Sequence, residues 1–190
     1  MKFKRLVKGV MIKGVYSYMQ ESMNSETADK MLPEAGLGVN IRSILPSSWY
    51  DIDKYRLLSQ LYSKRLNVSE REFLIAVGRH SIVKDLNGIY RMLIKIGGMK
   101  RTIANIPKIS NAYTQCSMAE IVSNENGVYV SRVTTIADLA NWWLMGGEGA
   151  MRGLAEVCKT NMTSYKVDSQ NKITTESGEV IESIVTIRYS

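Results

Sequence analysis

Apolar residues recur at helical spacing through the first two-thirds of the chain and at strand spacing through much of the last third. The segment near residues 4–20 predicts a helix, and a second, short helix is expected to follow Ser25 and to stop by Gly36. The segment from there to Trp49 reads as a loop, after which Asp51 is positioned to cap a third helix. The apolar stripe of that helix consists of Ile52, Tyr55, Leu58, Leu61 and Tyr62.

The clearest helix start in the chain is the segment Ser-Glu-Arg-Glu at residues 69–72. Ser69 and Glu72 have the spacing of a capping box, in which each side chain accepts a hydrogen bond from the backbone N–H of the other residue. We expect this helix to pass through Gly78, to continue to Ile96, and to end at the glycines 97 and 98.

Another helix is expected over residues 100–113, either kinked or begun again at Pro107. From Cys116 the apolar period changes to two, which is typical of β-strands. Asn126 and Gly127 lie between two such segments and tolerate the positive φ angles of a tight turn, so they predict a β-hairpin.

The hairpin is followed by a further helical segment that extends to Val157. Thr135 and Asp138 have the spacing of a capping box that would open this helix. Gly146 and Gly147 are adjacent and predict a break within it.

Two closing strands are predicted over residues 161–167 and 180–189, joined by a polar turn. The predicted order is therefore four or five helices, two strands, a helix and two strands. This order indicates an α+β fold in which N-terminal helices pack on a four-stranded antiparallel sheet. We expect residues 1–190 to form a single domain of this kind.

Composition agrees with a chain that forms a hydrophobic core, because 45% of its 190 residues are apolar and three are proline. Cys116 and Cys158 are too few for a disulfide framework or a structural zinc site, which favours a reducing compartment. Lys8 and Lys13 interrupt the apolar part of what would otherwise resemble a signal peptide, and no run of about 18 apolar residues occurs. We therefore expect a cytoplasmic protein.

The formal net charge of +7 raises the question of a phosphate-bearing partner such as a nucleic acid or an anionic membrane. The basic residues are spread along the chain, which favours ordinary solvated surface over a binding patch. The residues whose convergence would decide this are Lys2, Lys4, Arg5, Lys95, Lys100, Arg101 and Lys108.

Residue types that carry catalysis are scarce, since His80 is the only histidine. We interpret His80 as a partly buried helix residue and the cysteines as inert core thiols, although a Cys–His pair would be reactive if the fold brought the two together. The glycines of residues 147–153 lack dinucleotide-binding spacing and follow helical sequence, and residues 97–101 are better explained as a helix break than as a phosphate site. No catalytic centre is recognised, so we expect a protein that is not an enzyme.

Several short patterns together resemble the superfamily of haem nitric-oxide/oxygen-binding domains. This superfamily also includes 4-vinyl-reductase ligand-binding domains, TRAPP-type tethering subunits and a myxobacterial paralogous family of unknown function. The patterns are Lys8-Gly9, Trp49-Tyr50-Asp51 to Leu58, Ala76-Val77-Gly78-Arg79, Gly97-Gly98, and Gly146 to Val157. The resemblance implies helices over a four-stranded antiparallel sheet, with a pocket between them that holds a ligand, haem being the best known.

The chain departs from the haem-binding members at two places. The stretch that would carry their axial histidine, Ile106 to Tyr113, has none. Their Tyr-x-Ser-x-Arg motif is matched only in part by Tyr129, Ser131 and Arg132, because the arginine falls one place early and on a strand would point to the opposite face. We therefore expect a member without haem or any other cofactor.

The function that these observations favour is a bacterial, non-enzymatic sensory or regulatory module that binds a small apolar or amphipathic molecule and forms a homodimer. Aromatic rings suit such a pocket. The candidate ligand-binding residues are Trp49, Tyr90, Trp142 and Trp143, with Arg132 as a partner for an anion. Two alternatives remain open: a homodimeric assembly subunit with a filled interior that recruits partner proteins, and binding of nucleic acid or anionic membrane through the basic surface.

Overall fold

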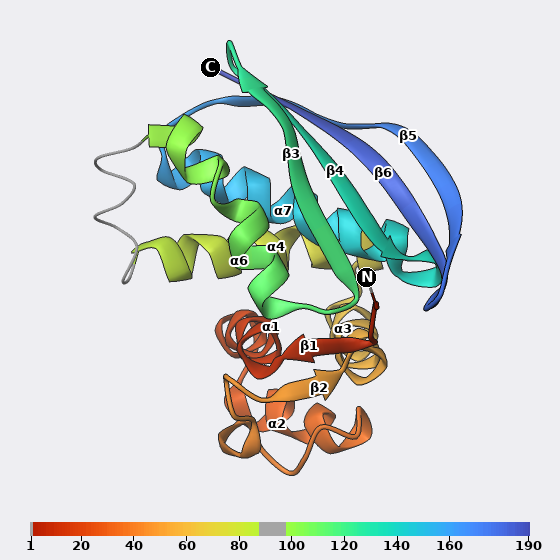
Figure 1. Cartoon of the computed structure of the whole chain (residues 1–190). Coiled ribbons are helices and arrows are strands. Elements are labelled where there is room, and N and C mark those ends of the chain that lie inside the picture. Colours follow the sequence, from red (N-terminus) through yellow and green to blue (C-terminus); the bar gives the residue numbers. More distant parts are fainter. Residues whose placement is uncertain (1, 88–97) are drawn as a thin grey trace.

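The computed structural model of the chain describes residues 2–87 and 98–190 (Figure 1). Its larger sheet has four antiparallel strands in the order β3-β4-β6-β5, with α7 and α4 beneath one face and the N-terminal helices beyond them. The predicted α+β class and the packing of N-terminal helices on a four-stranded antiparallel sheet are confirmed. Within the described residues, every helix is too short or too polar to cross a membrane.

The elements in chain order are β1 (Leu6–Lys8), α1 (Gly9–Ser22), α2 (Ser25–Glu34), a 3-10 turn (Ile41–Ser43), β2 (Trp49–Asp51), α3 (Ile52–Leu66), α4 (Glu70–Asn87), α6 (Ile106–Tyr113), β3 (Ser117–Glu125), β4 (Val128–Ile136), a second 3-10 turn (Ala137–Leu139), α7 (Ala140–Val157), β5 (Met162–Thr175) and β6 (Gly178–Tyr189). Residues 98–103 are also helical, and α6 begins again after them with Pro107 in its first turn, as predicted. The predicted extension of α4 to Ile96 lies outside the described residues.

The chain begins with a short strand where the pattern predicts helix from residue 4 onward. Leu6–Lys8 pairs antiparallel with Trp49–Asp51, and the helix starts only at Gly9. A side chain at Gly9 would overlap the carbonyl oxygen of Leu45, so glycine is needed where the loop before β2 crosses the start of α1. The prediction was wrong here because a three-residue strand is created by its distant partner rather than by its own periodicity.

Two of the predicted helix starts are confirmed. The Asp51 carboxylate accepts a hydrogen bond from the Asp53 amide at 2.8 Å. At the start of α4, Ser69 Oγ accepts from the Glu72 amide at 3.2 Å and Glu72 Oε2 accepts from the Ser69 amide at 3.0 Å. These are the reciprocal bonds of a capping box.

The predicted hairpin is β3–β4, and its turn residues Asn126 and Gly127 have φ angles of 51° and 72°. The predicted closing strands are present but the first is longer than expected, since β5 continues to Thr175, where it pairs with Gly178. The polar residues after Val167 looked like a turn, yet an edge strand needs only backbone pairing on one side and tolerates exposed polar side chains.

The capping box predicted at Thr135 and Asp138 does not form. Thr135 Oγ1 is buried and hydrogen-bonded to Ser117 Oγ at 3.0 Å across the β3–β4 pair. The Asp138 carboxylate instead pairs with Arg5. Both side chains are occupied by residues far away in the chain, so their spacing was misleading.

The break predicted at Gly146 and Gly147 is also absent, because α7 is one continuous helix that packs directly on α4. Added side chains at Gly149 and Gly153 would overlap the carbonyl oxygens of Ile75 and Arg79, so at these glycines the two helix backbones touch. Glycine in a helix interior is normally unfavourable by about 1 kcal/mol relative to alanine. Here it permits a close helix contact that no larger residue allows.

Ion pairs flank the glycine contact between α4 and α7. Glu148, with a side chain 8% exposed, accepts from Arg71 at 2.6 Å and from Arg152 at 2.7 Å. Arg79 of α4 pairs with Glu156 of α7 at 2.7 Å. These contacts occur in the same order along both helices, so α4 and α7 run parallel.

The buried apolar residues form two clusters, and α7 belongs to both. Leu139, just before α7, and Trp142 join the cluster built from the N-terminal helices. Leu144, Met151 and Leu154 join the cluster under the sheet. α7 is therefore the element through which the helical region and the sheet are held together.

A second connection between the two regions is the ion-pair cluster of Arg5, Asp53, Arg56 and Asp138. Arg5 bonds Asp53 at 2.5 Å and Asp138 at 2.8 Å, and Arg56 lies 3.7 Å from Asp138. The cluster thereby ties the start of α3 to the turn before α7. Hydrogen bonding to Arg5 lowers the pKa of both carboxyl groups from their usual range.

The glycine contact predicts opposite effects for one substitution at two positions of α7. Gly149→Ala should destabilise the protein by about 1–3 kcal/mol, the usual cost of overpacking, because the methyl group meets the Ile75 backbone. Gly146→Ala should be neutral or stabilising by up to about 1 kcal/mol, since nothing lies within 4 Å of the added carbon. Urea unfolding measures both, and equal effects would contradict the backbone contact.

The Arg5 cluster predicts a pH-dependent contribution to stability. Arg5→Met should lower the free energy of unfolding by about 1 kcal/mol at neutral pH, given the partial exposure of these groups. Because the folded pKa values of Asp53 and Asp138 are lowered, this contribution is complete above about pH 4 and is lost as the pH falls through the lowered values.

Unfolding of the wild type and Arg5→Met from about pH 7 to about pH 2 should therefore give stabilities that converge at acid pH. Lys30→Met is the matched control, because Lys30 forms an exposed pair with Glu26 within one helix and should contribute less to stability than the Arg5 pairs do. A difference between wild type and Arg5→Met that stays constant with pH would show that packing of the side chain, not its charge, matters.

Candidate functional site

A cavity of about 230 Å³ lies where the two apolar clusters meet. α1, α4, α6 and α7 line it, and α3 contributes Tyr55. Four glycines, Gly14, Gly78, Gly146 and Gly147, contribute no side chain to the wall. At Gly146 an added side-chain carbon would meet nothing within 4 Å, so the missing side chain leaves open space there.

The lining is apolar and uncharged among the described residues. Aliphatic side chains such as Leu74, Val77 and Ile82 alternate with aromatic rings, and the polar side chains are the hydroxyl groups of tyrosine and serine and the N–H groups of tryptophan. A charged ligand would lose its hydration here without gaining a partner of opposite charge. The cavity therefore suits an uncharged molecule.

Two of the predicted ligand-binding residues, Trp142 and Trp143, line this cavity. Their rings lie 6.3 Å apart, and Trp142 also contacts the Tyr55 ring edge to face at 5.4 Å. The first turns of α7 bring both rings to the cavity from adjacent positions. Ring size was the signal that identified them in the sequence.

Trp49 and Arg132 are not brought to the cavity. Trp49 lies in β2, is 38% exposed, and has the Lys8 amino group over its ring at 5.3 Å, because the two residues face each other in the β1–β2 ladder. Arg132 is exposed on β4, while Tyr129 and Ser131 are buried on the other face. The predicted reversal of Arg132 relative to Tyr129 and Ser131 is confirmed. Tyr90 lies outside the described residues.

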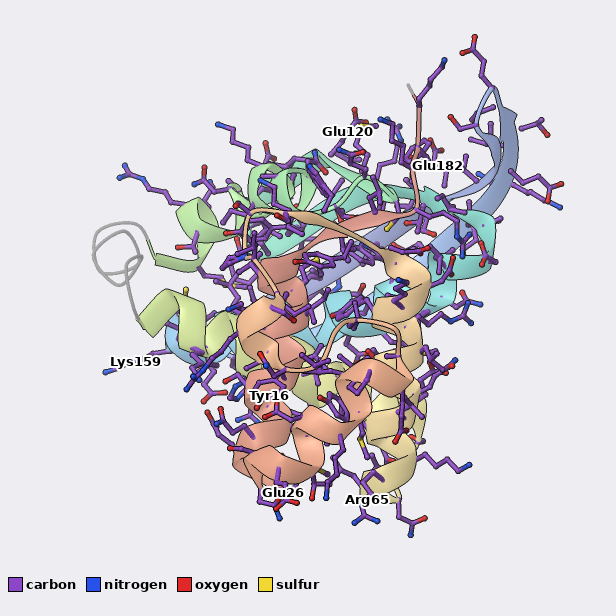
Figure 2. All side chains as sticks on the ribbon, turned by 90° about the horizontal axis from the view of Figure 1, so that it is seen from below. Tyr16, Glu26, Arg65, Glu120, Lys159 and Glu182 are labelled. Atoms are coloured by element: carbon purple, nitrogen blue, oxygen red, sulfur yellow. The ribbon has the colours of Figure 1, made fainter. Side chains whose placement is uncertain are left out.

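The partners of Arg132 are carboxylates on neighbouring strands. Glu120 of β3 is 3.6 Å away and Glu182 of β6 is 3.4 Å away. Figure 2 shows both glutamates on the opposite side of the molecule from Tyr16, Glu26 and Arg65 of the N-terminal helices. Arg132 is thus neutralised on the sheet, which removes the reason for assigning it to a bound anion.

Most of the lining was not identified from the sequence. The sequence pattern places Tyr55 in the apolar stripe of its helix and gives no sign that Met11, Gly14 and Ile109 line a cavity. Isolated glycines within helical segments, such as Gly14 and Gly78, were the available signal, because they mark places where a helix approaches another element or leaves space.

In the described lining of the cavity there is no histidine, cysteine or carboxylate. His80 of α4 points toward α1, where its Nε2 is 3.3 Å from Ser17 Oγ and its Nδ1 is 3.6 Å from Glu21 Oε2. Burial raises the pKa of the Cys116 thiol to about 11, so it stays protonated at neutral pH. Among the described residues, no group of three or more histidine, cysteine, aspartate or glutamate side chains could hold a metal ion.

Comparison with known proteins finds a match in structure alone. No protein-family model matches the sequence, and no curated protein matches it. Solved H-NOX domains share the fold over nearly the whole chain. The oxygen complex of an oxygen-binding H-NOX domain related to soluble guanylate cyclases has a TM-score of 0.74 at 12% identity, covering 96% of this chain and 95% of that one.

Two further H-NOX structures give similar values. A mutant of the T. tengcongensis domain has a TM-score of 0.68 at 14% identity, with 96% of this chain and 97% of that one covered. A structure solved to study H-NOX activation has a TM-score of 0.71 at 13% identity, with 96% of each chain covered. At these identities the likeness concerns the fold, not the chemistry of the site.

A haem of the kind that the family resemblance implies does not fit the described lining. The lining has no histidine for the iron and no lysine or arginine for the propionates. Its volume of about 230 Å³ is also below the roughly 300–1,000 Å³ of pockets for drug-sized molecules. The described lining therefore lacks the groups and the volume that a haem requires.

Proposed function

We propose that this chain, whose fold is that of H-NOX domains, is a haem-free, non-enzymatic sensory module of the cytoplasm that binds a small apolar or amphipathic molecule in the cavity between α1, α4, α6 and α7. The observation that carries the proposal is the cavity itself, walled by paired tryptophans and aliphatic side chains in the part of the chain that the structure describes. Protein interiors otherwise leave few spaces larger than a water molecule.

The position of the cavity indicates how binding would be transmitted. Its walls belong to both apolar clusters, so a ligand would contact the N-terminal helices and the sheet-bound half of α7 together. A ligand with different affinities for two arrangements of these regions shifts the equilibrium between them. The changed surface would then act on a partner protein or on the second copy in a homodimer.

The two alternative functions have less support. An assembly subunit was expected to have a filled interior, and the cavity counts against it. For a basic binding surface, several cations are already neutralised, among them Arg5, Arg79 and Arg132. Both free cysteines agree with a reducing compartment, in keeping with the proposed location.

Filling the cavity tests the proposal. Gly146 lines the cavity with no atom within 4 Å of an added Cβ, so Gly146→Leu would place its side chain in the space. We expect naphthalene to raise the melting temperature of the wild type, as a ligand of the folded state must, and Gly146→Leu to weaken binding at least about tenfold. Gly146→Ala is the matched control and should keep most of the affinity.

Binding that is unchanged in Gly146→Leu would show that the probe occupies another site. Absence of a thermal shift with naphthalene and other apolar probes, together with no copurifying molecule in native mass spectrometry, would refute the proposed function.

The haem-free state is tested by titration with haemin. Because the described lining lacks an imidazole and a cation, we expect no saturable Soret shift at one equivalent. A haem-binding H-NOX domain treated in the same way provides the positive control. A stoichiometric, saturable spectrum would overturn this part of the proposal and leave ligand binding by the cavity to be judged separately.

A further inference from the structure

Four polar side chains from two helices meet at one place on α1 and α4. Ser17 and Glu21 lie one turn apart on α1, and His80 and Lys84 lie one turn apart on α4. His80 Nε2 is 3.3 Å from Ser17 Oγ, and His80 Nδ1 is 3.6 Å from Glu21 Oε2. The Lys84 amino group donates to Ser17 Oγ and lies 3.3 Å from Glu21 Oε1. The described lining of the cavity includes none of these four residues.

The partners in this cluster set the direction of each hydrogen bond. An ammonium group can only donate, so Lys84 leaves the Ser17 hydroxyl hydrogen free to point at His80 Nε2. An ionised carboxylate can only accept, so Glu21 favours the form of the His80 ring that carries its hydrogen on Nδ1. The ring nitrogen that faces Ser17 is therefore a proton acceptor.

This is the arrangement in which a histidine serves as base for a serine. The serine hydroxyl donates to the imidazole, and a carboxylate on the other side of the ring orients it. Distances between such groups are often long before a reactant binds and shorten when it does. The Tyr18 ring packs edge to face on the His80 ring at 5.5 Å and supports it from α1.

The exposure of the cluster allows a small reactant to approach. The side chains of Glu21 and Lys84 are 60% and 57% exposed, whereas that of His80 is 17% exposed. The imidazole is thus largely shielded from water while the cluster still borders the solvent. The Lys84 ammonium also stabilises negative charge that develops on an oxygen atom beside Ser17.

We infer that Ser17 is a nucleophile that accepts an acyl group from an activated ester or thioester, with His80 as its base. The Ser17 oxygen forms a bond to the acyl carbon, and the bond from that carbon to the leaving oxygen or sulfur breaks. His80 takes the Ser17 proton and passes it to the leaving group. Glu21 acts through His80 and is a positioning residue. One transfer modifies the chain without turnover, so the inference is independent of ligand binding by the cavity.

Acetylation by p-nitrophenyl acetate tests the inference on the full chain. The reaction is quenched in acid, the protein is digested, and tandem mass spectrometry locates the acetyl group. We expect it on Ser17. Ser22 is the internal control and should stay unmodified, because it lies on the same helix but its hydroxyl donates to the Tyr18 carbonyl at 2.9 Å.

Two substitutions separate the base from the positioning residue. His80→Gln should lower the rate of Ser17 acetylation at least about 100-fold, since assistance by a general base contributes this much or more. Glu21→Gln should lower the rate and also shift the ring hydrogen of His80 away from Nδ1, a change that a merely structural role would not produce. Nitrogen NMR reads that shift directly because the chain has one histidine. Melting curves establish that each variant folds.

Three results would overturn the inference. The first, which needs no variant, is the absence of acetyl on Ser17 of the wild type under conditions that acetylate exposed lysines. The second is acetyl on Lys84 in place of Ser17. The third is a rate at Ser17 that is the same in His80→Gln as in the wild type. Each of these leaves the proposed function to its own test with naphthalene.

Discussion

The contact between α4 and α7 sets the geometry on which the rest of the structure depends. Two helices normally keep their axes apart by the thickness of their side chains. At Gly149 and Gly153 the α7 backbone instead touches the backbone of α4, and the Arg71–Glu148 and Arg79–Glu156 pairs lie along the same contact. Since α7 also contributes to the cluster under the sheet, this contact, together with the Arg5 ion-pair cluster, holds the helical region against the sheet.

The same use of glycine explains why a cavity exists at this place. Gly149 and Gly153 lack a side chain so that backbones can meet, whereas Gly146 and Gly147, less than one turn earlier, face the cavity. Large rings stand beside these small residues at Trp142 and Trp143. Close packing and open space thus follow each other along a single helix.

The likeness to H-NOX domains concerns the fold, since the identity is only 12–14%. The matches cover 96% of this chain. Its single histidine, however, faces Ser17 and Glu21, and Arg132 of β4 is paired with carboxylates on the far face of the sheet. A fold can keep a space between helices and sheet while the groups lining it change. The fold arranges the helices and the sheet, and the residues of this chain decide which groups line the space between them.

The features that the sequence alone determined are those in which the interacting residues are close in the chain. The Asp51 cap, the Ser69–Glu72 capping box and the Asn126-Gly127 turn belong to this class, and the alternation of apolar residues identified the sheet. The size of their rings alone was enough to predict Trp142 and Trp143 as candidate ligand-binding residues. Each of these signals is contained in a few neighbouring residues.

Tertiary structure alone decided the remainder. Leu6–Lys8 is a strand because Trp49–Asp51 lies beside it, and the same pairing places Trp49 opposite Lys8 at the surface instead of in the cavity. Tyr55 belongs to the site because its helix meets α7 at Trp142. Packing between residues far apart in the chain decides which helix faces meet. The spacing of apolar residues within one helix carries no information about its partners.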